Sequence, residues 1–271
     1  APTPFLRAMT EFAIKTLRLH ADGEFELIVV EAGDSHFDRK EDPSYISQYY
    51  ASNSACRIDK YFNFNPKIGG VKELNAGVRA ASNEFVLSTG NDVIAPPHWD
   101  TELLRCFEER ADCGVASLSA FEPGAVIGPL AAQDRIVEGM YSPFMMFRSD
   151  KFVAEHPSDY AGTMIPTEFD EGYVKIYQDS DFVMKMYEAR FRAYRSCRAH
   201  VHHLLRMTSD RVDPGKHQQD LAHDERWFYE RWGKSPLAAF AMIRYGQYAY
   251  GQEHRSFTDP IQLHYDPKAK A

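Results

Sequence analysis

Three groups of side chains in this sequence are of types that bind cations or exchange protons. They are a single aspartate after an apolar run, a pair of aspartates at the start of a helical pattern, and a pair of histidines at the end of an apolar run: Asp92, Asp179 with Asp181, and His202 with His203. Carboxylates prefer hard divalent cations, imidazole is a common metal ligand, and both transfer protons. Their use depends on where the fold places them.

Asp92 has the clearest local context. Residues 85–87 are apolar and β-favouring, and small or polar residues follow directly from Ser88 to Asp92. A buried strand that ends in such a turn is the usual place of a ligand site in an open α/β sheet. A carboxylate there can hold a divalent cation, and the cation can hold a diphosphate. Taken alone, the turn has a simpler interpretation, in which Asp92 only accepts local hydrogen bonds.

The composition describes an ordinary globular protein. The chain has 271 residues, 44% hydrophobic and 26% charged, with a formal net charge of -8. This charge argues against a general nucleic-acid coat or a binder of anionic membranes. Four cysteines without a C-x-x-C pair, and no signal peptide, indicate a reduced, cytoplasmic chain. No apolar run approaches the ~20 residues of a membrane span.

The hydrophobic pattern predicts an α/β fold with alternating helices and strands. Helical spacing is seen at 5–17, 71–81 and 99–110, and strand-like runs at 27–30, 85–88, 114–118, 141–147 and 195–203. Alternation of this kind predicts a doubly wound sheet, with its continuous apolar strands fully buried. The section 210–271 is predicted to be mostly helical, with Ser235 and Pro236 starting one helix. We expect that helix to pack on the core or on a second subunit.

Three segments, taken together, resemble glycosyltransferase family 2, whose members are inverting enzymes with the GT-A fold. The first is ELIVVEAGDS, similar to the family's strand-two motif. The second is KIGGVKELNAGVRAASNEFVLSTGNDV, in which Gly69, Asn75, Gly77 and Val78 fall at the family's spacings. The third runs from FDEGYVKIYQDSDF to HVHH and is similar to the family's F-D-E, E-D-x-D-L and V-x-H motifs. The resemblance covers roughly residues 6–209.

This resemblance implies a Rossmann-like, mixed and mostly parallel sheet over residues 1–209, followed by a helical extension over 210–271. It also implies a nucleotide-sugar donor, most simply a UDP-sugar, held with Mn²⁺ or Mg²⁺. The metal would be bound by Asp92 and by a histidine of the last strand. Adjacent strand residues point to opposite faces, so only one of His203 and His202 should face the site, and His203 is the first candidate. A structural role for these histidines is an equal alternative.

The resemblance assigns the other site residues in two groups. Asp179 is implied as the general base that takes the proton of an acceptor hydroxyl, and Asp181 either shares this role or anchors the helix. Helix capping is the competing interpretation for both. The donor-binding group lies where the family recognises nucleoside and phosphates: Glu31, Asp34, Lys67, Lys72, Asn75 and Asn91. As lone residues, the two lysines are more often solvated surface than phosphate ligands.

The sequence departs from the family pattern at three points. The family's first strand has no counterpart before the opening helix, the D-x-D triplet reads Gly90-Asn91-Asp92, and Gln178 replaces the usual glutamate. Two other functions therefore stay open: a nucleotidyltransferase that makes nucleotide sugars, and a non-catalytic carbohydrate-binding protein. Trp227 and Trp232 could line an acceptor site or pack in the core, and we expect the core for Trp232.

Overall fold

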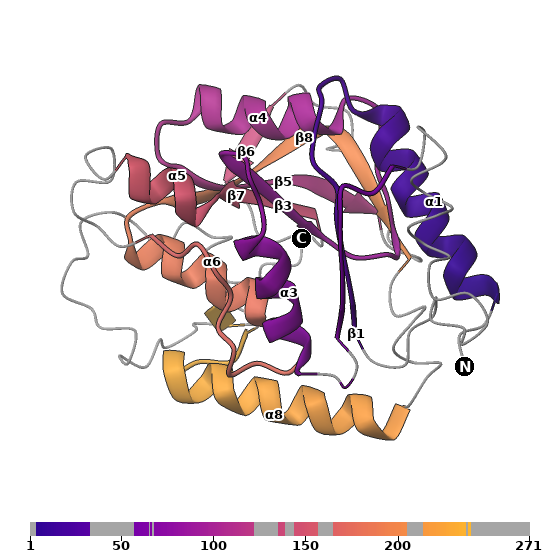
Figure 1. Cartoon of the computed structure of the whole chain (residues 1–271). Helices are drawn as coiled ribbons and strands as arrows, with labels where there is room; N and C mark the ends of the chain where they lie inside the picture. The colour runs from indigo at the N-terminus through magenta and orange to yellow at the C-terminus, as the bar shows by residue number, and fades with distance from the viewer. Residues whose placement is uncertain are drawn as a thin grey trace, which may run out of the picture.

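The computed structural model describes residues 4–32, 57–64, 66, 68–121, 135–138, 144–156, 165–204, 214–236 and 238–239. These residues form two β-sheets with helices around them (Figure 1). The helices are α1 (Pro4–His20), α3 (Gly70–Arg79), α4 (Trp99–Glu109), α5 (Asp150–Glu155), α6 (Gln178–Glu188) and α8 (Pro214–Trp232). The strands are β1 (Ile28–Ala32), β2 (Lys60–Phe64), β3 (Phe85–Thr89), β4 (Val93–Ile94), β5 (Cys113–Phe121), β6 (Ile136–Glu138), β7 (Phe144–Arg148) and β8 (Arg192–His203).

The larger sheet has the strand order β3-β7-β5-β8-β4, and β6 also pairs with β8. β5 runs parallel to β8 and antiparallel to β7, and β7 is antiparallel to β3. Strands β3, β5 and β8 therefore point the same way, so their carboxyl ends lie toward one end of the sheet. Ligand sites of open α/β sheets lie outside that end.

The predicted mixed α/β architecture is confirmed, but the pairing is less parallel than expected. In the described part of the chain, β1–β2 and β5–β8 are parallel, and the four other pairs are antiparallel. The reason is that β4, β6 and β7 all run against their neighbours. Of these, the sequence pattern had indicated only the strand within 141–147.

The large sheet is covered on both faces, and each face has its own core. Alternate strand residues point to opposite sides, so Val115 and Phe147 pack with α3, α6 and α8, while Ala116 and Met146 pack with α1 and α4. Figure 1 shows α4 on one side of the sheet and α3, α6 and α8 on the other. The predicted helices at 5–17, 71–81 and 99–110 are all confirmed, because their apolar stripes face these cores.

The predicted strand at 27–30 forms as β1, but it is not fully buried. Its residues Ile28, Val29 and Val30 are partly exposed, and within the described residues β1 pairs only with β2. Helix α3 packs against β1 so closely that a Cβ on Gly77 would lie 2.7 Å from Val30 Cγ2. The strand at 27–30 is therefore apolar because it packs against α3, and not because it lies in the middle of one continuous sheet.

The C-terminal section contributes to the main core. Phe228, Trp232 and Ala239 are essentially inaccessible and belong to the α3–α6 side of the core. This places Trp232 in the core, as expected, whereas the side chain of Trp227 is 40% exposed. The helix predicted after Ser235 lies mostly outside the described residues. In the part of the chain described, none of the helices is long and apolar enough to span a bilayer.

Candidate functional site

The turn that carries Asp92 crosses the carboxyl end of the large sheet. It joins β3 to β4, which are at opposite edges of that sheet. The Asp92 carboxylate folds back over Gly90, where an added Cβ would lie 2.6 Å from Asp92 Oδ1. The backbone N–H of Leu204 donates to the Asp92 carbonyl oxygen at 2.8 Å. Glycine at 90 and the contact with the end of β8 therefore fix where the carboxylate lies.

His203 is brought next to Asp92 by the pairing of β4 with β8. In this register Val93 lies opposite His203, and His203 Nε2 is 3.6 Å from Asp92 Oδ2. The two side chains are 13% and 14% exposed. The neighbouring His202 is exposed, as alternation along a strand requires. Among the described residues, no group of three or more Asp, Glu, His or Cys side chains is placed to bind a metal.

Asp179 lies in the first turn of α6. Because α6 leads into the start of β8, its first turn lies toward the end of the sheet at which β8 finishes. Asp179 is partly exposed, and its Oδ1 accepts hydrogen bonds from the Ser180 N–H at 2.6 Å and the Ser180 hydroxyl at 3.0 Å. Before it, Tyr177 has a φ of 65°, an uncommon value for a residue with a side chain. Asp179 therefore follows a backbone of uncommon conformation, and its carboxylate is bonded to the next residue.

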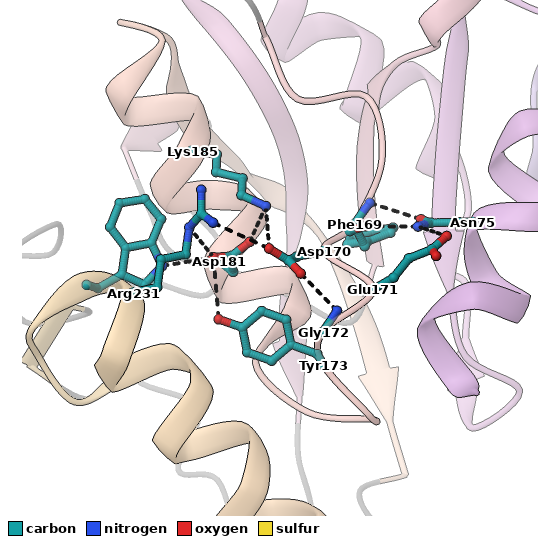
Figure 2. A network of polar contacts seen from close by, with 10 residues as sticks. Asn75, Phe169, Asp170, Glu171, Gly172, Tyr173, Asp181, Lys185 and Arg231 are labelled. Carbon is teal, nitrogen blue, oxygen red and sulfur yellow. Dashed lines mark hydrogen bonds and ion pairs between the residues drawn. The ribbon is translucent and has the colours of Figure 1, made fainter. Parts of the chain in front are cut away.

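Asp181, by contrast, is fully buried and bound from several sides (Figure 2). Trp232 Nε1 donates to Asp181 Oδ1 at 2.9 Å, Lys185 Nζ lies 2.7 Å from Oδ2, and Arg231 Nε lies 3.2 Å from Oδ1. The Tyr173 hydroxyl donates at 3.4 Å, and burial together with the Asp181 charge raises the pKa of this phenol. A buried carboxylate requires such partners. The arrangement is that of an anchor between α6 and α8.

Solved structures with the same fold are 14–16% identical to this chain in sequence. TarS from S. aureus, residues 1–349, has a TM-score of 0.54 at 14% identity over 90% of this chain and 70% of its own. The same protein in complex with UDP has a TM-score of 0.54 at 14% identity, over 97% and 74%. The mannosyltransferase PcManGT from Pyrobaculum calidifontis, in complex with GDP-Man and Mn²⁺, has 0.55 at 16% identity, over 91% and 67%. The chain has the GT-A fold. No family model and no curated protein matches the sequence.

Within the GT-A fold, three of the predicted donor-binding residues differ in their burial and in their contacts. Glu31, at the end of β1, is 8% exposed and accepts a hydrogen bond from the Tyr61 hydroxyl at 2.6 Å. Asn91 Nδ2 donates to Thr10 Oγ1 at 3.0 Å, which ties the Asp92 turn to α1. Lys72 is exposed near the start of α3. Asp34 and Lys67, also predicted to bind the donor, lie outside the described residues.

Asn75 lies in the interior of this GT-A domain rather than at a surface. Its side chain is fully buried, and its amide exchanges two hydrogen bonds with the backbone of Phe169, at 2.8 and 2.9 Å. Its Nδ2 also lies 3.3 Å from Glu171 Oε1. Because both polar atoms of the amide are used, Asn75 links α3 to the turn before α6. This position corrects the expectation that Asn75 contacts the donor directly.

Two further acidic residues shape this part of the GT-A domain: Asp224, which was not singled out at the sequence level, and Asp170, the aspartate of the F-D-E motif. Asp224 of α8 is fully buried and binds backbone N–H groups of residues 174–176. Asp170 accepts hydrogen bonds from Gly172 N–H and Lys185; burial alone would raise its pKa, but these bonds and the nearby cations hold it below the usual value. The sequence did contain a sign that Asp224 is buried: it lies four and eight residues before Phe228 and Trp232, and so on the same face of a helix.

Proposed function

We propose that this protein is an inverting, metal-assisted glycosyltransferase of the family 2 type, which moves a sugar from a nucleoside diphosphate to an acceptor hydroxyl. The observation that carries the proposal is the pairing of Asp92 with His203 at the carboxyl end of the sheet. The GT-A fold and the contents of the neighbouring structures, UDP in one and GDP-Man with Mn²⁺ in another, support it. A UDP-sugar is the first donor to test.

The donor atoms of Asp92 and His203 fit a divalent cation that is shared with the substrate. Mg²⁺ and Mn²⁺ sites in enzymes of this kind use one or two protein ligands and complete their shell with substrate phosphates and water. One carboxylate oxygen and one imidazole nitrogen, 3.6 Å apart and mostly shielded from solvent, supply such a partial set. Bound there, the cation would stabilise the charge of the departing diphosphate. The turn and β4 hold both side chains in place for it.

Asp179 is proposed to take the proton of the acceptor hydroxyl. The acceptor oxygen forms a bond to the anomeric carbon, the bond from that carbon to the diphosphate breaks, and the nucleoside diphosphate leaves with the electron pair. The hydroxyl proton passes to the Asp179 carboxylate. One direct displacement inverts the anomeric centre. Asp179 is suited to this role because it is partly exposed at the start of α6, whereas Asp181 is buried and paired.

The metal assignment is tested by donor affinity. With Mn²⁺ present, Asp92→Ala should weaken binding of the nucleotide sugar by about tenfold or more, which is about 1.4 kcal/mol, because the cation loses its carboxylate ligand. In EDTA the variant and the wild type should bind equally. Titration calorimetry gives both values, and Asp150→Ala, on α5, is the control. Equal donor affinity of Asp92→Ala and wild type in Mn²⁺ would remove the assignment.

The base assignment is tested by turnover and stereochemistry. Asp179→Asn keeps the shape of the side chain but removes its basicity, so transfer should slow by about 10²–10⁴-fold while donor affinity stays at the wild-type value. Released nucleoside diphosphate measures the rate, and NMR of the product gives its anomeric configuration. Wild-type turnover of Asp179→Asn, or a retained configuration, contradicts the mechanism.

The same assay separates the two alternative functions. A nucleotidyltransferase would release pyrophosphate from a sugar phosphate and a nucleoside triphosphate, and a carbohydrate-binding protein would release neither product.

We also propose a reducing, cytoplasmic location. It is supported by the buried, unpaired thiols of Cys106, Cys113 and Cys197.

A further inference from the structure

Asp224 on α8 is a fully buried carboxylate whose main partners are backbone amides of a distant segment. Its Oδ1 accepts a hydrogen bond from the Val174 N–H at 2.8 Å, and its Oδ2 accepts from the N–H groups of Lys175 and Ile176 at 2.8 and 2.7 Å. His223 Nδ1 lies 2.9 Å from Oδ1. Charge-assisted hydrogen bonds of this kind are about twice as strong as neutral ones and offset the cost of burying the charge. The helix thus binds three successive amides of one loop.

That loop leads directly into the first turn of α6. Ile176 is followed by Tyr177, whose φ of 65° is a conformation that a residue with a Cβ adopts only when its surroundings impose it. The Tyr177 carbonyl accepts the N–H of Asp181 at 2.9 Å, which closes the first helical turn. Asp179 lies within this turn. The direction of its carboxylate therefore depends on how residues 174–177 are held.

The loop is also fixed from its other side and at its far end. A Cβ added to Gly70 of α3 would lie 2.8 Å from the Val174 carbonyl oxygen, so α3 already touches the loop backbone. Beyond Asp179, the buried Asp181 is held by Trp232 and Arg231 of α8 (Figure 2). Helix α8 therefore binds this segment at two places, before and after Asp179.

We propose that Asp224 is a positioning residue for the reaction: it holds loop 174–177 so that the Asp179 carboxylate meets the acceptor hydroxyl. This inference rests on the proposed function, in which Asp179 is the base. A misplacement of about 1 Å at a reacting group can cost ~10²-fold in rate. Donor binding should not depend on Asp224, because Asp92 and His203 lie on the β3–β4 turn and on β8.

The first arm of the test measures the loop itself and needs no substrate. Hydrogen–deuterium exchange of the peptide covering residues 173–181 is compared in the wild type, Asp224→Asn and the control Asp220→Asn, one turn earlier on α8. We expect faster exchange of the amides at 174–176 in Asp224→Asn only, because an asparagine oxygen can replace at most part of the carboxylate's three bonds. Unchanged exchange in Asp224→Asn overturns the proposal.

The second arm asks whether Asp224 acts through Asp179. Asp224→Asn should lower kcat by about tenfold or more with unchanged donor Kd, and this loss should largely disappear when it is added to Asp179→Asn. Losses that multiply overturn the positioning role, since a general structural defect would act in both backgrounds. Wild-type turnover of Asp179→Asn alone is a different result, which refutes the proposed base itself.

A second variant covers the case in which Asp224→Asn does not fold. Gly70→Ala introduces a Cβ against the Val174 carbonyl from α3 and should shift the same loop without removing a buried partner. It should give the same faster exchange at 174–176, the same loss in kcat and the same non-additivity with Asp179→Asn. A loss that multiplies with that of Asp179→Asn counts against the proposal.

Discussion

At the scale of single residues, the structure separates side chains that the sequence presents as equivalent. Asp179 and Asp181 are two positions apart on one helix, yet one is partly exposed and the other is fully buried among Lys185, Trp232 and Arg231. The difference follows from the helical repeat, because residues two apart lie on different faces. One aspartate is partly exposed, as the proposed role of a base requires, and the other joins two helices.

The adjacent histidines His202 and His203 allow a matched test of the same kind. His203→Ala should weaken Mn²⁺-dependent binding of the nucleotide sugar by about tenfold, because its Nε2 lies 3.6 Å from Asp92 Oδ2. His202→Ala should leave this affinity unchanged, because the side chain is exposed on the opposite face of β8. Calorimetric titration in Mn²⁺ measures both. A larger loss from His202→Ala would mean that the other face of β8 carries the ligand.

At the scale of elements, acidic residues of the turn before α6 form ion pairs with basic side chains of three helices. Arg79 of α3 contacts Glu168 and Glu171, while Asp170 contacts Lys185 of α6 and Arg231 of α8. The hydrogen bond from Arg79, followed by that from Asn75, holds the pKa of Glu171 below its usual value. These contacts join α3, α6 and α8 at one turn, although none of them is a local feature of one element.

The lowered pKa of Asp170 predicts a specific dependence of stability on pH. Because the folded-state pKa lies below the unfolded value of 3.8, the contribution of Asp170 is fully present above about pH 4. It is lost as the pH falls through the folded pKa. Asp170→Asn should therefore lower the free energy of unfolding most at neutral pH, and its difference from wild type should shrink below pH 4. Urea unfolding between pH 7 and 3 measures this, with Glu155→Gln as the control. A difference that stays constant across this range contradicts the prediction.

At the scale of the whole molecule, α8 belongs to the same core as α3, α6 and one face of the large sheet. The boundary predicted near residue 210 is therefore not a boundary between hydrophobic cores in the described part of the chain. Trp232 is central to this, since it is almost fully buried and its indole N–H is paired with Asp181. We accordingly expect helix α8 to unfold together with the sheet.

This expectation is tested by Trp232→Ala. Loss of a buried tryptophan costs about 3–5 kcal/mol, so the melting temperature of the whole chain should fall, with one transition in both the variant and the wild type. Trp227→Ala, at a side chain that is 40% exposed, should have a smaller effect. Differential scanning calorimetry shows the number of transitions and their midpoints. A separate low-temperature transition that is confined to the variant's α8 would contradict the shared core.

The sequence by itself determined most of the elements and the chemical types at the site. Apolar periodicity and turn residues act locally, which is why the strand before Asp92 was predicted with nearly the observed limits, the last strand with its observed end at His203, and a helical pattern with its start at Asp179 and Asp181. The resemblance already implied that Asp92 and a histidine of the last strand lie together; the tertiary structure alone decided that this histidine is His203, that Asn75 is buried and that Asp224 binds residues 174–176. Each of these joins segments that are distant in sequence, and such contacts depend on strand register and helix packing. No local pattern encodes them, because they exist only once the two cores have formed around the sheet.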